Sequence, residues 1–357
     1  FPLIAIPLFI LAGSIMNSSG ISRRLIAFAS ALVGFIKGGL SMINIATSMF
    51  FAEISGSAVA DVAALGSILI PAMKKKGYPG PFAAAVTSSS ASLAIIIPPS
   101  IPMIVYAVMA QSSVVQLFVA GVVPGIIGGF LMMFAAYIYA RRKNLPIEEN
   151  FNLVNLRKTA KEAALAFLLP IIILGGIFGG VVTATEGAGL AVVAALIIGL
   201  IYREFDFKRL YQAATEGAIQ TAAVMLLVAA SVLLGEFLTV EQIPQKVAES
   251  IIDMTQNKYA VLAILNVFLL VIGFFLHSVA AIILTVPIVM PLVNAVGIDP
   301  VHFGIIVTLN LAIGQQTPPV ASVLVTACSV AKADIWDVTR ANICLLYTSP
   351  SPRDRYI

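Results

Sequence analysis

The chain has 357 residues, of which 60% are hydrophobic and only 11% are charged, with a mean hydropathy of +1.02 and a formal net charge of +4. This composition excludes a soluble globular domain and predicts an all-α polytopic membrane protein in a lipid bilayer. The lysines and arginines cluster in short connections, as topology signals do, so we expect no nucleic-acid partner. Two cysteines, Cys328 and Cys344, indicate neither a metal site nor a disulfide framework.

Residues 1–37 predict a scaffold helix followed by an amphipathic arm. Residues 38–110 predict a helical hairpin followed by a broken helix. The hairpin is expected to enter and leave on the cytoplasmic side, because Lys37 precedes its apolar stretch and Lys74 follows it. Its tip is expected at the polar run Ser55-Gly56-Ser57, for which a simple tight turn between packed helices is the alternative interpretation.

The helix after the hairpin is expected to break at Pro98-Pro99, because proline removes a backbone donor. The rest of the chain is divided into four parts: scaffold helices over 111–257, a second hairpin and a helix broken at Pro318-Pro319 over 258–331, an amphipathic arm over 332–345, and a polar tail, disordered or non-native, over 346–357. Phe1 stands inside an apolar run, so we expect a chain truncated at its start, and the abrupt tail suggests the same at its end.

The two hairpin-and-break units share landmarks in the same order. Ile70-Pro71 corresponds to Met290-Pro291, Val86 corresponds to Val307, and the two proline pairs follow. One unit is entered from the cytoplasm and the other from outside, which predicts inverted repeats; chance similarity of apolar segments is the alternative. Paired broken helices in corresponding halves of a membrane protein indicate a transporter's binding site.

Several of these runs resemble one known family. They are listed here together: Ala5-Ile6-Pro7-Leu8-Phe9-Ile10-Leu11-Ala12-Gly13, Ser55-Gly56-Ser57-Ala58-Val59-Ala60-Asp61, Ile97-Pro98-Pro99-Ser100, Gly297-Ile298-Asp299-Pro300-Val301-His302-Phe303-Gly304 and Gln316-Thr317-Pro318-Pro319-Val320. The sequence is similar to the large membrane subunit of tripartite ATP-independent periplasmic (TRAP) transporters over roughly residues 1–345.

The resemblance implies a multi-pass protein of the bacterial inner membrane that imports an organic acid, a C4-dicarboxylate or a sugar acid, with sodium as the coupling ion and no other cofactor. It also implies two partners, a small four-helix membrane subunit and a periplasmic substrate-binding protein. The implied mechanism is an elevator, in which the hairpins and broken helices slide against a scaffold. The alternative is a stand-alone sodium/dicarboxylate elevator symporter that needs no binding protein.

Sodium is a hard cation that prefers oxygen ligands, which unwound backbone supplies as carbonyls. The first candidate site consists of Ser55, Ser57, Ala94, Ile97 and Pro99, and the family's first sodium site resembles it. The second candidate site consists of Gly273, Gly314, Gln316 and Thr317, where a merely kinked helix is the alternative. The chain departs from the family's pattern at His277, where an acidic residue is common, and at Ala94-Ile95, where Gly-Pro is common. Carbonyl ligation would survive both changes.

Five hydroxyl residues are predicted to line a substrate cavity: Ser88, Ser89, Ser90, Ser92 and Thr308. Hydrogen bonding between helices is the alternative for the serine run. Asp61, an ionisable group at membrane depth, is predicted to tune the electrostatics of the first hairpin, or else to cap a neighbouring helix. The sequence contains no Gly-x-Ser-x-Gly or His-Glu-x-x-His motif, so we predict that the chain is not an enzyme.

Overall fold

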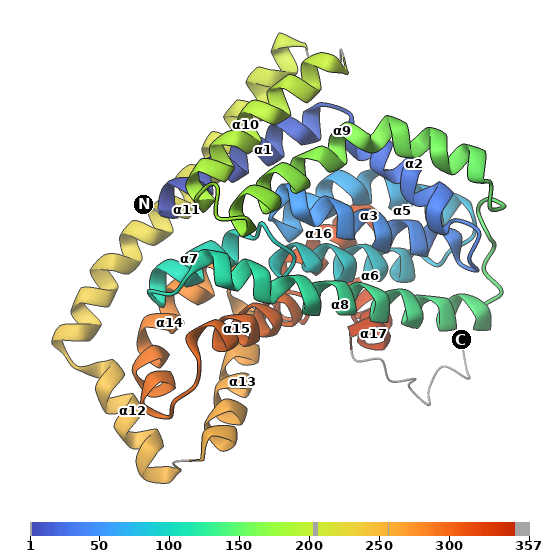
Figure 1. The fold of residues 1–357 in the computed structure, drawn as a ribbon. Coiled ribbons are helices and arrows are strands. Elements are labelled where there is room, and N and C mark those ends of the chain that lie inside the picture. The colour runs from blue at the N-terminus through green and yellow to red at the C-terminus, as the bar shows by residue number, and fades with distance from the viewer. Residues whose placement is uncertain (1, 203–205, 256, 347–357) are drawn as a thin grey trace.

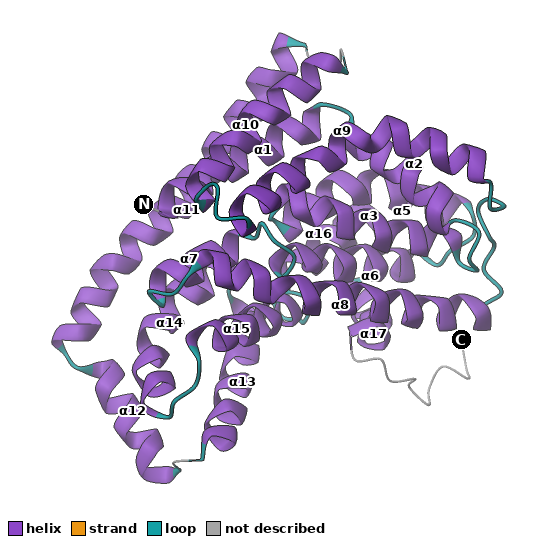
Figure 2. Ribbon diagram, viewed as in Figure 1, coloured by secondary structure: helices purple, strands orange, loops and turns teal. Residues whose placement is uncertain are grey.

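The computed structural model describes residues 2–202, 206–255 and 257–346, and all regular elements in these ranges are helices (Figures 1 and 2). Their bounds are η1 Pro2–Ile4, α1 Ala5–Ser18, α2 Ile21–Val33, α3 Gly39–Ser55, α4 Ala58–Asp61, η2 Val62–Gly66, α5 Ser67–Lys75, α6 Gly80–Ala91, η3 Ser92–Ile95, α7 Ile101–Met109, α8 Val114–Arg142, α9 Leu153–Phe178, α10 Ala184–Ile201, α11 Phe207–Val240, α12 Ile243–Met254, α13 Lys258–Phe275, α14 Ser278–Ala295, α15 Pro300–Gly314, α16 Ser322–Ala331 and α17 Ile335–Leu346. Of the predicted tail, residues 347–357 lie outside the described part of the chain.

Six of the described helices are long and apolar enough to cross a membrane, namely α8, α9, α10, α11, α13 and α14. The pair α1 and α2, bent by 72°, would add a seventh span if it is counted as one. About 20 apolar helical residues are needed to cross the hydrocarbon core. The prediction of an all-helical polytopic membrane protein is therefore confirmed.

Helix α6 lies at the centre of the molecule, between α3, α16 and α17 (Figure 1). Its residues from Phe82 to Ala91 are all buried. Around this centre, α1 packs on α10 and α11, while α2 packs on α3 and α9. Helices α12 to α15 form a second group, in which α13 contacts α15 and α12 contacts α14.

The long helix α8 packs closely on the chain around the first proline pair. A Cβ atom on Gly121 would come within 2.5 Å of the Ile96 carbonyl oxygen, and one on Gly125 within 2.5 Å of Ile97 Cγ1. Glycines one helical turn apart are what allow two backbones to approach this closely in a membrane. Helix α8 therefore covers the first break directly.

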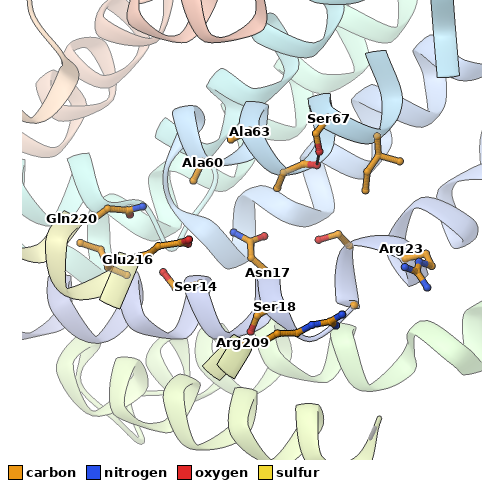
Figure 3. Close-up of a pocket in the computed structure, with 16 residues that line it drawn as sticks. Ser14, Asn17, Ser18, Arg23, Ala60, Ala63, Ser67, Arg209, Glu216 and Gln220 are labelled. Atoms are coloured by element: carbon orange, nitrogen blue, oxygen red, sulfur yellow. Dashed lines mark hydrogen bonds between the residues drawn. The ribbon is translucent and has the colours of Figure 1, made fainter. Parts of the chain in front are cut away.

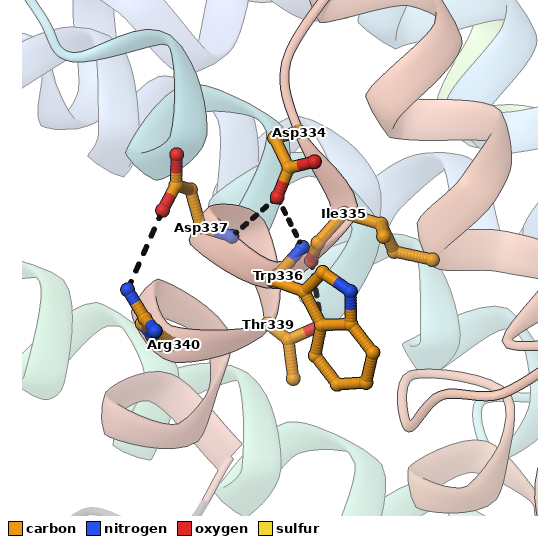
Figure 4. A network of polar contacts seen from close by, with 6 residues as sticks. All are labelled: Asp334, Ile335, Trp336, Asp337, Thr339 and Arg340. Carbon is orange, nitrogen blue, oxygen red and sulfur yellow. Dashed lines mark hydrogen bonds and ion pairs between the residues drawn. The ribbon is translucent and has the colours of Figure 1, made fainter.

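Helix α17 begins at a side-chain cap. The Asp334 carboxylate accepts hydrogen bonds from the backbone N–H groups of Trp336, at 2.9 Å, and Asp337, at 3.3 Å (Figure 4). Capping satisfies amide donors that have no partner within the helix. Trp336 is exposed, but α17 also packs on α6 and buries Asn342. One face of this predicted arm thus belongs to the core.

Candidate functional site

The tip of the first hairpin lies against the first break. Gly56, at φ 58°, turns the chain between α3 and α4, and a Cβ atom there would sit 3.0 Å from the Pro99 carbonyl oxygen. Across the break, the Ser100 hydroxyl donates to the Ile95 carbonyl at 2.7 Å. The side chain of Ser55 lies outside the described residues, but the backbone places it and Ser57 on either side of Gly56.

The tip of the second hairpin meets the second break in the same way. A Cβ atom on Gly314 would come within 2.6 Å of the Gly273 Cα atom, and the Val320 N–H donates to the Phe274 carbonyl at 3.2 Å. Gln316 and Thr317 lie in the turn that follows α15, and both Pro98-Pro99 and Pro318-Pro319 have cis peptide bonds. The structure thus places each hairpin tip against the break that carries the other residues of its predicted sodium site, and the sodium sites themselves stay predictions.

These two junctions offer carbonyl and hydroxyl oxygens rather than a cluster of acidic or imidazole ligands. Among the described residues, no group of three or more His, Cys, Asp and Glu side chains could hold a metal ion. Interrupted helices present carbonyl oxygens that do not depend on side-chain identity, and such oxygens suit a hard monovalent cation. The donors present therefore fit sodium.

Several of the predicted substrate residues make hydrogen bonds within their own chain segment. Thr308 donates within its own helix, to the carbonyls of Gly304 and Ile305, both at 3.0 Å. The four serines on α6 and η3 are buried, and Ser88 and Ser92 donate to carbonyls three residues earlier in the chain. The prediction that they line a substrate cavity stays a prediction.

The serine run takes part in a buried polar network that reaches α3. Asn44 donates to the Thr87 hydroxyl at 2.6 Å, and the hydroxyls of Ser48 and Ser90 lie 2.9 Å apart. All four side chains are at most 1% exposed. Buried polar groups need such partners, because an unpaired one would cost about 1–3 kcal/mol. The network holds the first hairpin arm against the broken helix.

A second network links the first unit to the second break through α17. The Gln316 side chain donates to the Ser88 carbonyl at 2.8 Å, and Asn342 donates to the Gln316 side-chain oxygen at 3.3 Å. The Ser89 hydroxyl closes the ring by donating to Asn342. We call Ser88, Ser89, Gln316 and Asn342 the amide ring. Sequence reasoning missed Asn342; its only signal was one amide within an amphipathic helix.

Asp61 is fully buried at the end of α4, where its N–H donates to the Ser57 carbonyl at 3.0 Å. The five residues that follow it, Val62–Gly66, form the π-helix η2. Short π-helical segments often occur at functional sites. The carboxylate therefore lies one helical turn from the tip of the first hairpin, beside an irregular segment of its second arm.

A cavity of about 510 Å³ lies between α1, α2, the second arm of the first hairpin and α11 (Figure 3). None of the predicted sodium or substrate residues lines it. Its wall includes Asn17, Ser67, Arg209 and Glu216.

Comparison with known proteins decides the family. The family model of the DctM component of the tripartite ATP-independent periplasmic transporters matches residues 1–349. The chain belongs to this family. The resemblance seen in the sequence is thereby confirmed, and because the family consists of transporter permeases, so is the prediction that the chain is not an enzyme.

Three curated relatives illustrate the range of this family. The isethionate TRAP transporter permease protein DctMQ of Oleidesulfovibrio alaskensis is 42% identical over 97% of this chain and 55% of the relative. The C4-dicarboxylate TRAP transporter large permease protein DctM of Pseudomonas aeruginosa is 40% identical over 96% of the chain and 80% of the relative. The sialic acid TRAP transporter large permease protein SiaM of Vibrio cholerae is 36% identical over 97% and 81%. The chain thus spans about half the length of the first relative and about four fifths of the other two.

Proposed function

We propose that this chain is the large permease subunit of a sodium-coupled importer of organic acids in the bacterial inner membrane. Its partners would be a small four-helix membrane subunit and a periplasmic substrate-binding protein. Family membership supports the tripartite assembly, and the names of the relatives support an organic acid as the substrate. Family membership also disfavours the stand-alone symporter.

One observation carries the sodium part of the proposal. At each of two separate places, a hairpin tip lies within van der Waals contact of an interrupted helix, Gly56 against Pro99 and Gly273 against Gly314. Backbone carbonyl oxygens lie at both contacts, that of Pro99 at the first and those of Gly273 and Asn310 at the second, and sodium prefers such oxygen donors. Sodium bound at a junction would hold the tip closed on the break.

We propose an elevator mechanism that uses the same geometry. Each hairpin with its broken helix would move as part of a transport domain past a scaffold built from α1 and α8 to α12. Sodium would favour the closed tips and so couple its own gradient to the movement of the acid, because a ligand shifts a conformational equilibrium only by its differential affinity for the two states.

The test is uptake into proteoliposomes that contain the full-length permease and its small subunit. We expect uptake of an organic acid only when an inward sodium gradient and the cognate binding protein are both present. Uptake that persists after sodium is replaced by potassium would contradict sodium coupling. Uptake that persists without the binding protein would favour the stand-alone symporter.

A further inference from the structure

The cavity of Figure 3 has two chemically different walls. The wall from the first hairpin carries the small side chains Ala60, Ala63, Ala64 and Ser67, which continue through the π-helix η2. The opposite wall, from α1 and α11, carries Ser14, Asn17, Ser18, Arg209, Glu216 and Gln220. Small, mostly apolar side chains on one side and polar side chains on the other leave room for a polar ligand between the two walls.

The polar wall is built by the contact of two helices. Arg209, Glu216 and Gln220 recur at spacings of seven and four residues, so they lie on one face of α11. Beside this face, a Cβ atom on Gly217 of α11 would be 3.4 Å from the Ser14 hydroxyl oxygen of α1, so the two helices are in contact here. The polar residues of α1 and α11 therefore face the same space.

The charges of the cavity favour an anion. Two guanidinium groups, Arg23 and Arg209, line it together with one carboxylate, Glu216. The two hairpin-and-break units contain no Lys or Arg over 38–73, 77–110 or 259–331. Guanidinium groups that could bind a carboxylate or a sulfonate are therefore present in this cavity and absent from those units. Arg pairs with such groups through charge-assisted hydrogen bonds.

The side-chain oxygen of Asn17 suits a ligand that also carries a hydroxyl. Within the described residues, the Asn17 side-chain oxygen is buried and has no hydrogen-bond partner. An amide oxygen cannot pair with an anion, and a buried acceptor without a partner costs free energy. If the Asn17 amide turns toward the cavity that it lines, its oxygen can accept a hydrogen bond from a ligand hydroxyl. Asn17 and Arg209 line the same cavity, so a hydroxyl and an acid group on one small molecule could meet them together.

We propose that this cavity is a second, exit-side binding site for a hydroxylated organic anion, with Arg209 binding its carboxylate or sulfonate and Asn17 its hydroxyl. The exit-side role of the site rests on the proposed function, in which the acid would pass from the transport units to the cytoplasm. Arg23 and Arg209 stand at the same end of the bundle, which the distribution of basic residues marks as cytoplasmic. The acid would leave the hairpins and bind here before its release.

The test measures ligand protection of a cysteine placed in the cavity. The variant Ser14→Cys, with Cys328 and Cys344 replaced by Ala, is labelled with N-ethylmaleimide in inside-out membrane vesicles that contain the permease and its small subunit. The probes are two matched pairs that differ by one hydroxyl, malate with succinate and isethionate with ethanesulfonate. We expect the hydroxylated member of at least one pair to protect the thiol at a concentration about fivefold lower than its partner.

Three further variants assign the contacts. Arg209→Gln should raise the protecting concentration about tenfold, since it removes a charge-assisted hydrogen bond. Asn17→Ala should abolish the difference within the pair. Lys208→Gln removes the same charge one residue away, at a position that does not line the cavity, and should change nothing. Protection by no probe, equal protection within both pairs, or parent-like protection in Arg209→Gln would overturn the site.

Labelling requires neither a sodium gradient nor the binding protein, so the two proposals can fail separately. Protection without sodium-coupled uptake would contradict the proposed transport function and the exit-side role, and would leave only the binding of a hydroxylated anion in the cavity. Sodium-coupled uptake without protection would sink only the site.

Discussion

The two hairpin-and-break units place similar junctions in different surroundings. In the first unit all residues from Ala91 to Ser100 are buried, and the glycines of α8 lie directly on the break. In the second unit Pro319 and Val320 are exposed, Val320 by 48%. The proline pair sets where a helix breaks, whereas the neighbouring helices decide how tightly that break is held.

The units are more alike in the polar contact that joins each hairpin to its broken helix. In the first unit Asn44 on α3 donates to Thr87 on α6 at 2.6 Å, and in the second Asn310 on α15 donates to Asn266 on α13 at 2.6 Å. In both cases the first arm of the hairpin is tied to the first half of the helix that follows. The units therefore differ in how closely other helices pack over the break, and not in the hydrogen bond between hairpin and broken helix.

The largest loss of stability is expected where α8 packs on the first break. Gly121→Ala would place its Cβ atom 2.5 Å from the Ile96 carbonyl oxygen, so we expect the free energy of unfolding to fall by about 2–3 kcal/mol. Gly128→Ala on the same helix is the control, because its Cβ atom would make an ordinary 3.5 Å contact with Leu93. The unfolding midpoint of the purified complex measures both. Equal midpoints for the two variants would mean that α8 does not press on the break.

A smaller effect is expected at the second break, although the clash there is similar. Gly314→Ala would place its Cβ atom 2.6 Å from the Gly273 Cα atom, but the exposed side of this break can shift to relieve the strain. We expect a loss of about 1–2 kcal/mol in the free energy of unfolding, together with a higher sodium concentration for half-maximal uptake. A loss in stability larger than that of Gly121→Ala would reverse the comparison between the units.

The amide ring should contribute no more to stability than the second break does. Asn342→Ala leaves the buried Gln316 side-chain oxygen and the Ser89 hydroxyl without this partner, which should cost about 1–2 kcal/mol in unfolding free energy. Asn342→Asp, which keeps the acceptor for Ser89 but loses the donor for Gln316, separates the two contacts. If the ring holds the second break, both variants should also change the sodium dependence of uptake. Unchanged stability and sodium dependence in Asn342→Ala would show that the amide ring neither stabilises the fold nor holds the second break.

Two contacts hold the first hairpin at the end that the sequence predicts to be cytoplasmic. Lys76 forms an ion pair with Glu148 at 3.3 Å, and the Tyr78 hydroxyl donates to the Pro146 carbonyl at 3.5 Å. Burial raises the pKa of Tyr78 to about 12, so this hydroxyl keeps its proton at neutral pH. The connection after α8 is thereby fastened to the loop between α5 and α6.

The sequence was most informative where local chemistry decides the structure. A glycine with positive φ at position 56 and the prolines at 98–99 and 318–319 act through their own backbones, and helices end or turn at all three places. The pairing of hairpin tips with breaks was expected from the resemblance to the family, whereas the shared order of landmarks predicted only that the two units are repeats.

Long-range contacts could not be read from the sequence. The role of Asn342 depends on Ser89, 253 residues away, and the glycines of α8 matter only because Ile96 and Ile97 lie beneath them. The cavity wall joins α1 to α11, whose relative position no local pattern encodes. The serine run on α6 illustrates the same limit. The hydroxyl of Ser90 pairs with Ser48 on α3, and that of Ser89 pairs with the Asn342 amide on α17.

The most direct test of the central claim is the initial rate of acid uptake as a function of sodium concentration. Potassium replaces sodium at constant ionic strength, and the binding protein is saturating. With sodium bound at both junctions, we predict a sigmoidal dependence with a Hill coefficient above one and no uptake in potassium alone. A rate that does not depend on sodium would contradict the account of two hairpin tips closed by sodium.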